Sequence, residues 1–202
     1  MSKAVMLSIR PKWCGKIASG EKTIEVRKTR PKLDTPFKCY IYCTQGKHLA
    51  FMQNQTGTNL IACMDVTAAI PVGGAIGNGK VIGEFTCDRI DEYDDDTIFS
   101  FRHEDYARWN DFGLDRACMH PEDFQNYADG KWLYGWRISD LKIYDTPKEL
   151  TEFHTQGKCK SCSKSGYEST ACIYDENCMV PVAITKAPQS WRYVEAMKDA
   201  GV

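Results

Sequence analysis

The sequence contains no run of about 18 apolar residues, so we expect no helix that spans a membrane. Its first residues form too short an apolar stretch for a secretory signal peptide, and we predict a cytoplasmic protein. It has only four histidines, and none has a serine or cysteine at a spacing typical of a catalytic triad. Internal repeats and coiled-coil heptads are absent, which argues against solenoid and coiled-coil architectures.

The positive charge of the chain is concentrated near its beginning, although the 202 residues carry a net charge of only −1. Residues 1–32 include nine Lys or Arg and two Asp or Glu, whereas residues 33–150 include 11 basic and 19 acidic residues. Residues 151–202 have six of each sign. This asymmetry favours an anionic partner for the first segment.

The apolar pattern predicts several strands and a few helices rather than a regular strand–helix alternation. Such an order is typical of an α+β fold built on a small curved sheet or barrel. We expect strands at 4–9, 22–28 (half-buried), 37–43, 80–87 and 133–144, helices at 11–20, 100–109 and 120–128, a long excursion at 44–79, a solvated acidic loop at 91–96 and a short helical turn at 147–148.

Several motifs in this chain resemble the ASCH domain family. The first is Ser8-Ile9-x-Pro11-x-Trp13, and it is followed by a helix that ends at Gly20 and by Gly20-x-Lys22-x-x-Glu25-x-Arg27. Later matches begin at Gly79, Tyr134 and Pro188, and the last two are similar to a subgroup found in phages and Firmicutes-type genomes. The resemblance implies a PUA-like small β-barrel flanked by short helices at 1–150, followed by a Cys-rich appendage at 151–202 whose end returns to the barrel.

The resemblance also implies RNA or modified-nucleotide binding in a basic cleft. Lysine and arginine side chains would contact phosphates, and Trp13 or Trp136 would stack on an unpaired base. Glu25 would accept a hydrogen bond from a base or pair with Arg27. On this interpretation, Lys22 and Arg27 could be replaced without unfolding the protein. The alternative to a binding role is that these charges form an ordinary solvated strand face. The predicted binding residues are Ser8, Lys12, Trp13, Lys22, Thr23, Glu25, Arg27, Lys28, Arg30 and Trp136.

Two other functions stay open. Some ASCH proteins deacylate N4-acetylcytidine with a lysine and a threonine three positions later, and others are associated with RNA cleavage. Lys22 matches that lysine, but Glu25 stands at the threonine position, so an enzyme here would use Lys22 and Glu25 and would lack that nucleophile. A third possibility is a phage or host protein-interaction module that uses the acidic middle region, although the sequence names no protein partner.

Four cysteines lie within twenty residues of a polar segment, at Cys159, Cys162, Cys172 and Cys178. Four thiolates are a typical ligand set for structural zinc, and metal would explain how so polar a segment folds. A tail with free thiols is the alternative. No other cofactor is indicated, and we expect the remaining cysteines to be reduced core residues: Cys14, Cys39, Cys43, Cys63, Cys87 and Cys118.

Overall fold

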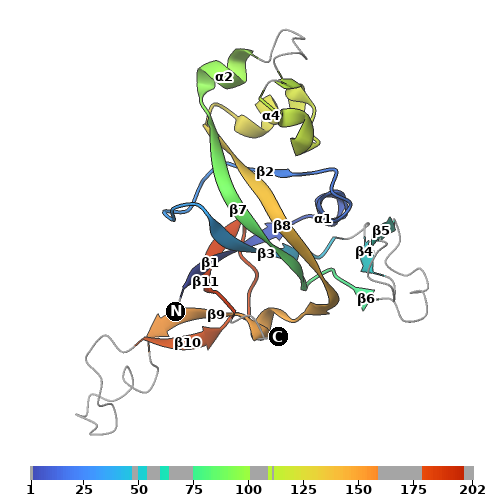
Figure 1. Cartoon of the computed structure of the whole chain (residues 1–202), viewed down its shortest axis with the longest axis vertical. Helices are drawn as coiled ribbons and strands as arrows, with labels where there is room; N and C mark the ends of the chain where they lie inside the picture. The colour runs from blue at the N-terminus through green and yellow to red at the C-terminus, as the bar shows by residue number, and fades with distance from the viewer. Residues whose placement is uncertain are drawn as a thin grey trace, which may run out of the picture.

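The computed structural model describes residues 2–46, 50–53, 60–63, 75–100, 109–110, 112–158 and 179–197. Its main sheet has six strands in the order β11-β1-β3-β7-β8-β2. β1 and β3 run parallel, and the other neighbouring pairs are antiparallel (Figure 1). The six strands are β1 (Lys3–Ile9), β2 (Ile24–Arg27), β3 (Phe37–Cys43), β7 (Val81–Tyr93), β8 (Leu133–Lys148) and β11 (Trp191–Glu195).

The first two elements follow the sequence pattern closely. Residues 4–9 of β1 are all buried, as expected for an apolar central strand. Helix α1 (Pro11–Ala18) begins at a proline, whose missing N–H is not needed in the first turn. It ends before Gly20, which has φ +80°, a left-handed conformation that favours glycine. These two elements bring the end of β1 and the start of β2 to the same side of the sheet.

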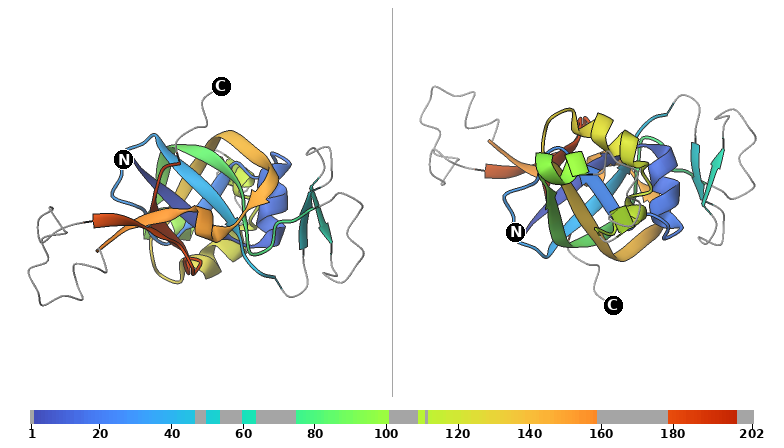
Figure 2. Two further views of the ribbon diagram at one scale, coloured as in Figure 1. Left: turned by 90° about the horizontal axis from the view of Figure 1, so that it is seen from below. Right: turned by 90° about the horizontal axis from the view of Figure 1, so that it is seen from above.

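β7 and β8 form a long, twisted ribbon that runs the length of the molecule (Figures 1 and 2). Three shifts in register interrupt their pairing, and such irregularities increase the local twist and bend. β7 continues through Asp91 to Tyr93, and helix α2 (Asp95–Ser100) follows, so the predicted acidic loop was wrong. The buried Tyr93 ring packs against Phe124, which anchors this end of the ribbon despite its charges.

The upper end of the ribbon is covered by short helices: α2, the 3-10 helix η1 (Leu114–Ala117) and α4 (Pro121–Ala128) (Figure 1). Trp109, Leu114 and Phe124 are buried there against Ile24 and Val26 of β2. Complete burial of one such apolar side chain contributes roughly 1.5–3 kcal/mol. These apolar contacts hold α4 and η1 beside β2, and we call α2, η1 and α4 together the helical cap. The predicted helix at 100–109 lies mostly outside the described residues.

Two smaller sheets extend from the main one. β4 (Ala50–Gln53) pairs with β5 (Leu60–Cys63) and β6 (Ala75–Ile76), all within the predicted excursion. β8 continues through Lys148, where a helical turn was predicted, and the 3-10 helix η2 (Leu150–Glu152) comes after it. β9 (His154–Lys158) and β10 (Met179–Ala183) then form an antiparallel pair, and β11 returns to lie beside β1.

The sequence predicted a small barrel, and the structure shows a curved, sheet-dominated α+β fold (Figure 2). In the described part of the chain no backbone pairing joins the two edge strands, β2 and β11. Side chains cross this opening instead. The Trp191 indole donates to Thr29 Oγ1 at 2.9 Å, and the Tyr193 hydroxyl accepts from the backbone N–H of Lys32 at 2.7 Å.

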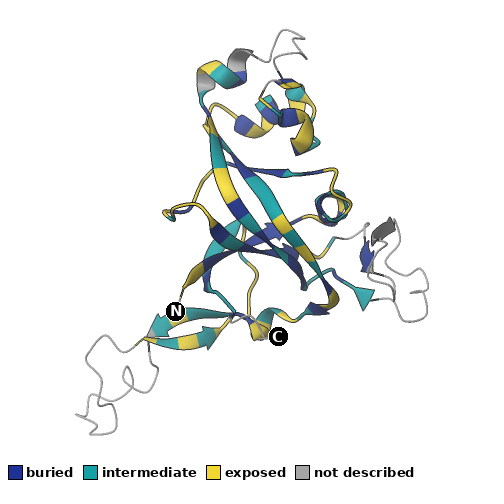
Figure 3. Ribbon diagram, viewed as in Figure 1, coloured by how far each residue is buried: buried dark blue, intermediate teal, exposed yellow. Residues whose placement is uncertain are grey.

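β2 is buried along its whole length, so the prediction of a half-buried strand was wrong, and the solvated face given as the alternative is not what the structure shows (Figure 3). Ile24 and Val26 pack into the helical cap, and Glu25 and Arg27 face the other way into the molecule. The helices on one side and the α1 turn on the other cover both faces. Among the described residues, no helix is long and apolar enough to cross a membrane.

Candidate functional site

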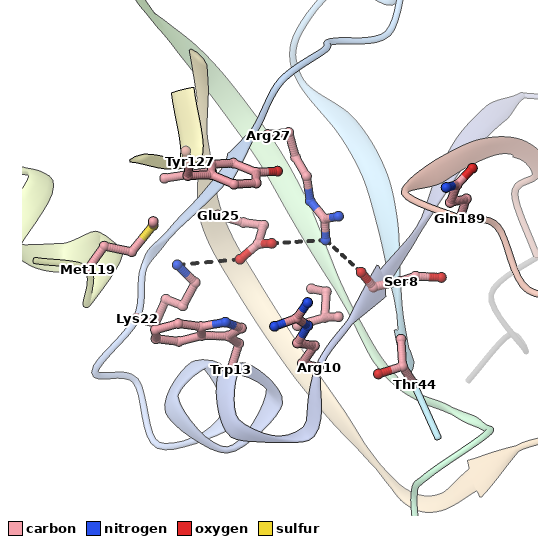
Figure 4. Close-up of a pocket in the computed structure, with 12 residues that line it drawn as sticks. Ser8, Arg10, Trp13, Lys22, Glu25, Arg27, Thr44, Met119, Tyr127 and Gln189 are labelled. Carbon is pink, nitrogen blue, oxygen red and sulfur yellow. Dashed lines mark hydrogen bonds and ion pairs between the residues drawn. The ribbon is translucent and has the colours of Figure 1, made fainter. Parts of the chain in front are cut away.

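A pocket of about 420 Å³ opens where the end of β1, α1, β2 and α4 meet (Figure 4). Its volume lies in the range typical of small-molecule sites. Charged groups form its floor, and aromatic and polar side chains form its walls. The lining residues are Ser8, Ile9, Arg10, Trp13, Lys22, Glu25, Val26, Arg27, Thr44, Met119, Tyr127 and Gln189.

A line of three buried charges crosses the floor of the pocket. The Glu25 carboxylate lies 3.4 Å from Lys22 Nζ and 2.9 Å from Arg27 Nη2. All three residues are buried: Lys22 is 2% exposed, Glu25 is 6% exposed and Arg27 is 7% exposed. Since water is excluded, the carboxylate is held by two cations in a fixed position rather than by a mobile solvent shell.

Arg27 also connects elements that the backbone leaves unpaired. Its Nη2 donates to the Ser8 carbonyl at 2.8 Å, and its Nη1 lies 3.4 Å from Ser190 Oγ. The Ser8 hydroxyl donates in turn to the Pro188 carbonyl at 2.5 Å. Arg27 Nε is buried without a hydrogen-bond partner among the described residues. Since this nitrogen is buried, its unmet hydrogen bond is a cost to stability rather than a contact offered to a ligand.

Lys22 is anchored at the opposite end of this charged line. Its ammonium donates to the Ala117 carbonyl of η1 at 2.6 Å, and it lies 5.1 Å from the centre of the Trp13 ring. Burial lowers the pKa of Lys22 below its ordinary value, and the neighbouring Glu25 carboxylate opposes that shift. The Lys22 ammonium therefore gives up its proton more readily than the ammonium of an exposed lysine does.

Two aromatic rings project into the pocket on either side of the Glu25 carboxylate in the view of Figure 4: Trp13 from α1 and Tyr127 from α4. Each has a lysine near its ring, with Lys12 Nζ 4.9 Å from the Trp13 centroid and Lys28 Nζ 5.2 Å from that of Tyr127. Burial raises the pKa of Tyr127, so its hydroxyl stays protonated at neutral pH. The walls thus offer flat apolar faces above a polar floor.

The pocket collects half of the predicted binding residues. Ser8, Trp13, Lys22, Glu25 and Arg27 line it. The remaining five do not line it. Lys12 lies near the Trp13 ring and Lys28 near the Tyr127 ring, and Arg30 forms an exposed ion pair with Glu92. Thr23 lines a different pocket, and Trp136 is fully buried in the core beside Phe37.

The other lining residues had not been predicted as binding residues: Ile9, Arg10, Val26, Thr44, Met119, Tyr127 and Gln189. Tyr127 lies on the predicted helix at 120–128, one residue before the buried Ala128 and three after the buried Phe124. Gln189 belongs to the Pro188 motif of the resemblance, which was a usable signal. Arg10 is exposed at the pocket edge, and no described residue pairs with it.

The predicted zinc ligands, Cys159, Cys162, Cys172 and Cys178, all lie outside the described residues. Within the described residues, no group of three or more potential ligand side chains could hold a metal ion. Four of the cysteines expected in the core are buried: Cys14, Cys39, Cys43 and Cys87. Cys118 is half-buried, which corrects that expectation, because it follows η1 in a left-handed turn at the edge of the cap.

Comparison with known proteins gives a limited result. No family model and no curated protein matches the chain. Similar solved structures include an ASCH protein from Zymomonas mobilis, which is 19% identical, with a TM-score of 0.44 and an alignment that covers 73% of each chain. A tyrosine-to-phenylalanine variant of it is 20% identical over 74% of this chain and 77% of that one, with a TM-score of 0.45. Similarity at this level assigns no activity.

Proposed function

We propose that the chain is an ASCH-type protein with a PUA-like fold, and that its pocket binds a base of RNA or of a modified nucleotide. The observation that carries the proposal is the position of Glu25: its carboxylate is fixed between Lys22 and Arg27, at the floor of a pocket flanked by Trp13 and Tyr127. A flat heterocycle with an amino group fits such a site, since it needs stacking faces and a fixed acceptor.

The charge of the pocket suits an anionic ligand. Arg10, Lys22 and Arg27 line it together with one carboxylate, that of Glu25, which leaves two positive charges in excess. Lys22 and Arg27 are occupied by Glu25 and by backbone carbonyls, so they set the electrostatic potential and the position of Glu25. Arg10 is exposed at the edge without a partner in the described part of the chain, and it is the group that we expect to contact a phosphate.

Binding of fluorescently labelled single-stranded RNA, followed by anisotropy, tests this proposal. Trp13→Leu and Tyr127→Leu should each weaken binding roughly 5- to 150-fold, the loss expected when a base loses one stacking partner. Trp132→Leu is the matched control, because Trp132 is 48% exposed and does not line the pocket. An equal loss in the control, or no loss in either pocket variant, would contradict a base-binding role.

A hydrolase is the second candidate, and the state of Lys22 favours it. Its lowered pKa and its 3.4 Å separation from Glu25 place a proton donor and a carboxylate base together on the floor of one pocket. An amide bond placed above Glu25 would meet both groups. This candidate requires turnover, whereas the binding proposal does not, so an assay of product formation from acylated cytidine separates them.

A further inference from the structure

A second pocket, of about 570 Å³, lies behind the first. Lys22 lines the first pocket and its neighbour Thr23 lines the second, because successive side chains of an extended segment point to opposite sides. The same division occurs on η1, where the Ala117 carbonyl accepts from Lys22 while Arg116 lines the second pocket. The two pockets are therefore separated by little more than one extended strand segment and one helical turn.

Two arginines of the second pocket are oriented by a shared carboxylate. Asp91 Oδ2 accepts a hydrogen bond from Arg137 Nε at 2.6 Å, and Asp91 Oδ1 forms an ion pair with Arg89 Nε at 2.8 Å. Both contacts use the inner nitrogen of the guanidinium. Neither arginine donates a hydrogen bond from its terminal amines to another side chain of the described residues.

Gly113 stands in front of the outer edge of Arg137, since a side-chain carbon there would lie 3.4 Å from both terminal amines, and its φ of +67° favours glycine. The guanidinium groups that face outward are therefore those of Arg89, whose side chain is 63% exposed, and Arg116. Arg116 is exposed and has no partner in the described part of the chain. Counting Arg89, Arg116 and Arg137 against Asp88 and Asp91, the pocket retains one net positive charge.

We propose that this second pocket binds a phosphate group. Arginine guanidinium groups with free outer edges make two-point hydrogen bonds to phosphate oxygens, and the Thr23 hydroxyl supplies a further donor. The phosphate comes either from the backbone of an RNA strand whose base enters the first pocket or from a free phosphate compound. The RNA backbone as the source rests on the proposed function of the first pocket. Binding of a phosphate group in the second pocket does not depend on that function.

Titration with inorganic phosphate, followed by the backbone amide resonances of ¹⁵N-labelled protein at constant ionic strength, is the first test. Wild-type protein should show saturable shifts at Thr23, Gly113 and Arg116. Arg89→Lys keeps the charge but loses the planar fork, and it should weaken phosphate binding about tenfold, the loss expected for one charge-assisted hydrogen bond. The matched control is Lys142→Ala, an exposed positive charge on the neighbouring strand β8 that does not line the pocket.

The absence of saturable shifts in wild-type protein would overturn the proposal, and so would an equal weakening in Lys142→Ala. The source of the phosphate is decided by RNA anisotropy across a salt series with Arg116→Ala, which removes one positive charge from the pocket. A fall in the log–log salt slope of about one per lost contact supports the RNA backbone, and an unchanged slope with intact phosphate shifts supports a free phosphate compound. If the first pocket does not bind a base, the phosphate titration still tests whether the second pocket binds phosphate.

Discussion

Arg27 donates a hydrogen bond of 2.8 Å to the carbonyl of Ser8, although their strands, β2 and β1, are separated by the opening of the sheet. The same guanidinium holds Glu25 at 2.9 Å. One side chain therefore joins the edge strand β2 to β1 across the opening and positions the acceptor on the floor of the candidate site. Fold and site depend on the same residue, which makes the effect of its removal informative.

Arg27→Leu should lower the free energy of unfolding by about 3–5 kcal/mol, because the change leaves the buried Glu25 carboxylate with one cation and the Ser8 carbonyl without its donor. Urea unfolding measures this. Arg30→Leu is the control, since Arg30 forms an exposed ion pair with Glu92 and its loss should cost about 0–1 kcal/mol. An Arg27→Leu loss as small as that of Arg30→Leu would contradict a structural role for Arg27. The sequence-based expectation that Lys22 and Arg27 can be replaced without unfolding the protein would then stand.

Lys22 should make stability depend on pH in a defined direction. Its pKa is lowered in the folded protein by burial, so between the folded and the unfolded pKa the unfolded chain binds the extra proton. The cost of burying the charged amine is therefore present at neutral pH and is relieved as the pH rises toward the ordinary lysine pKa of 10.5. Wild-type protein should gain stability relative to Lys22→Met over that range.

Paired urea titrations of wild type and Lys22→Met at several pH values from neutral upward measure this difference. Taking the difference cancels the other groups that titrate, such as Tyr93, whose pKa burial raises to about 12. If the difference in free energy of unfolding between the two proteins stays constant, or if the wild type loses stability relative to Lys22→Met as the pH rises, Lys22 is not held in a desolvated state.

The resemblance and the geometry together predict that the wild-type protein does not deacylate N4-acetylcytidine at an appreciable rate. The family's threonine position is occupied by Glu25, and its carboxylate is engaged by Lys22 at 3.4 Å and Arg27 at 2.9 Å. A carboxylate so engaged is a weakened nucleophile. Chromatography of released cytidine is the measurement, and sustained turnover by the unmodified protein would favour the hydrolase over the binding protein.

The tail should bind one zinc ion through Cys159, Cys162, Cys172 and Cys178, as the clustering of four thiols in a polar segment predicts. Elemental analysis of protein purified without added metal measures the content, with a Cys159→Ser/Cys162→Ser variant for comparison. The main sheet should stay folded when the metal is chelated, because its buried core comes from strands on either side of that segment. Zinc-free wild type, or equal zinc in the variant, would contradict this site.

The sequence predicted the main elements of the fold well where local signals were strong. β1, α1 and β3 were found within one or two residues because apolar runs, Pro11 and Gly20 mark their limits. The burial of β2 was missed, since its charges resemble those of a solvated face. Only the packing of distant helices against Ile24 and Val26, and of α1 on the other side, encloses these charges.

The site was predictable in part for the same reason. Lys22, Glu25 and Arg27 are close in the chain, so their spacing alone placed them together. Tyr127 reaches the pocket only through the tertiary placement of α4, a hundred residues later. Trp136 carried a sequence signal as strong as that of Trp13, yet its ring faces the core beside Phe37 and Trp191. An aromatic residue in a strand gives no local sign of whether it is packed in the core or lines a pocket.

The central claim is that a base occupies the space between Trp13 and Tyr127, above Glu25. Its most direct test is a titration of protein carrying ¹⁵N-labelled tryptophan with each of the four ribonucleotides and with a single-stranded RNA. The account predicts that the indole N–H resonance of Trp13 shifts and saturates with at least one of them, while that of the exposed Trp132 does not move. A Trp13 resonance that stays in place with every ligand, or that moves only together with Trp132, would contradict the account.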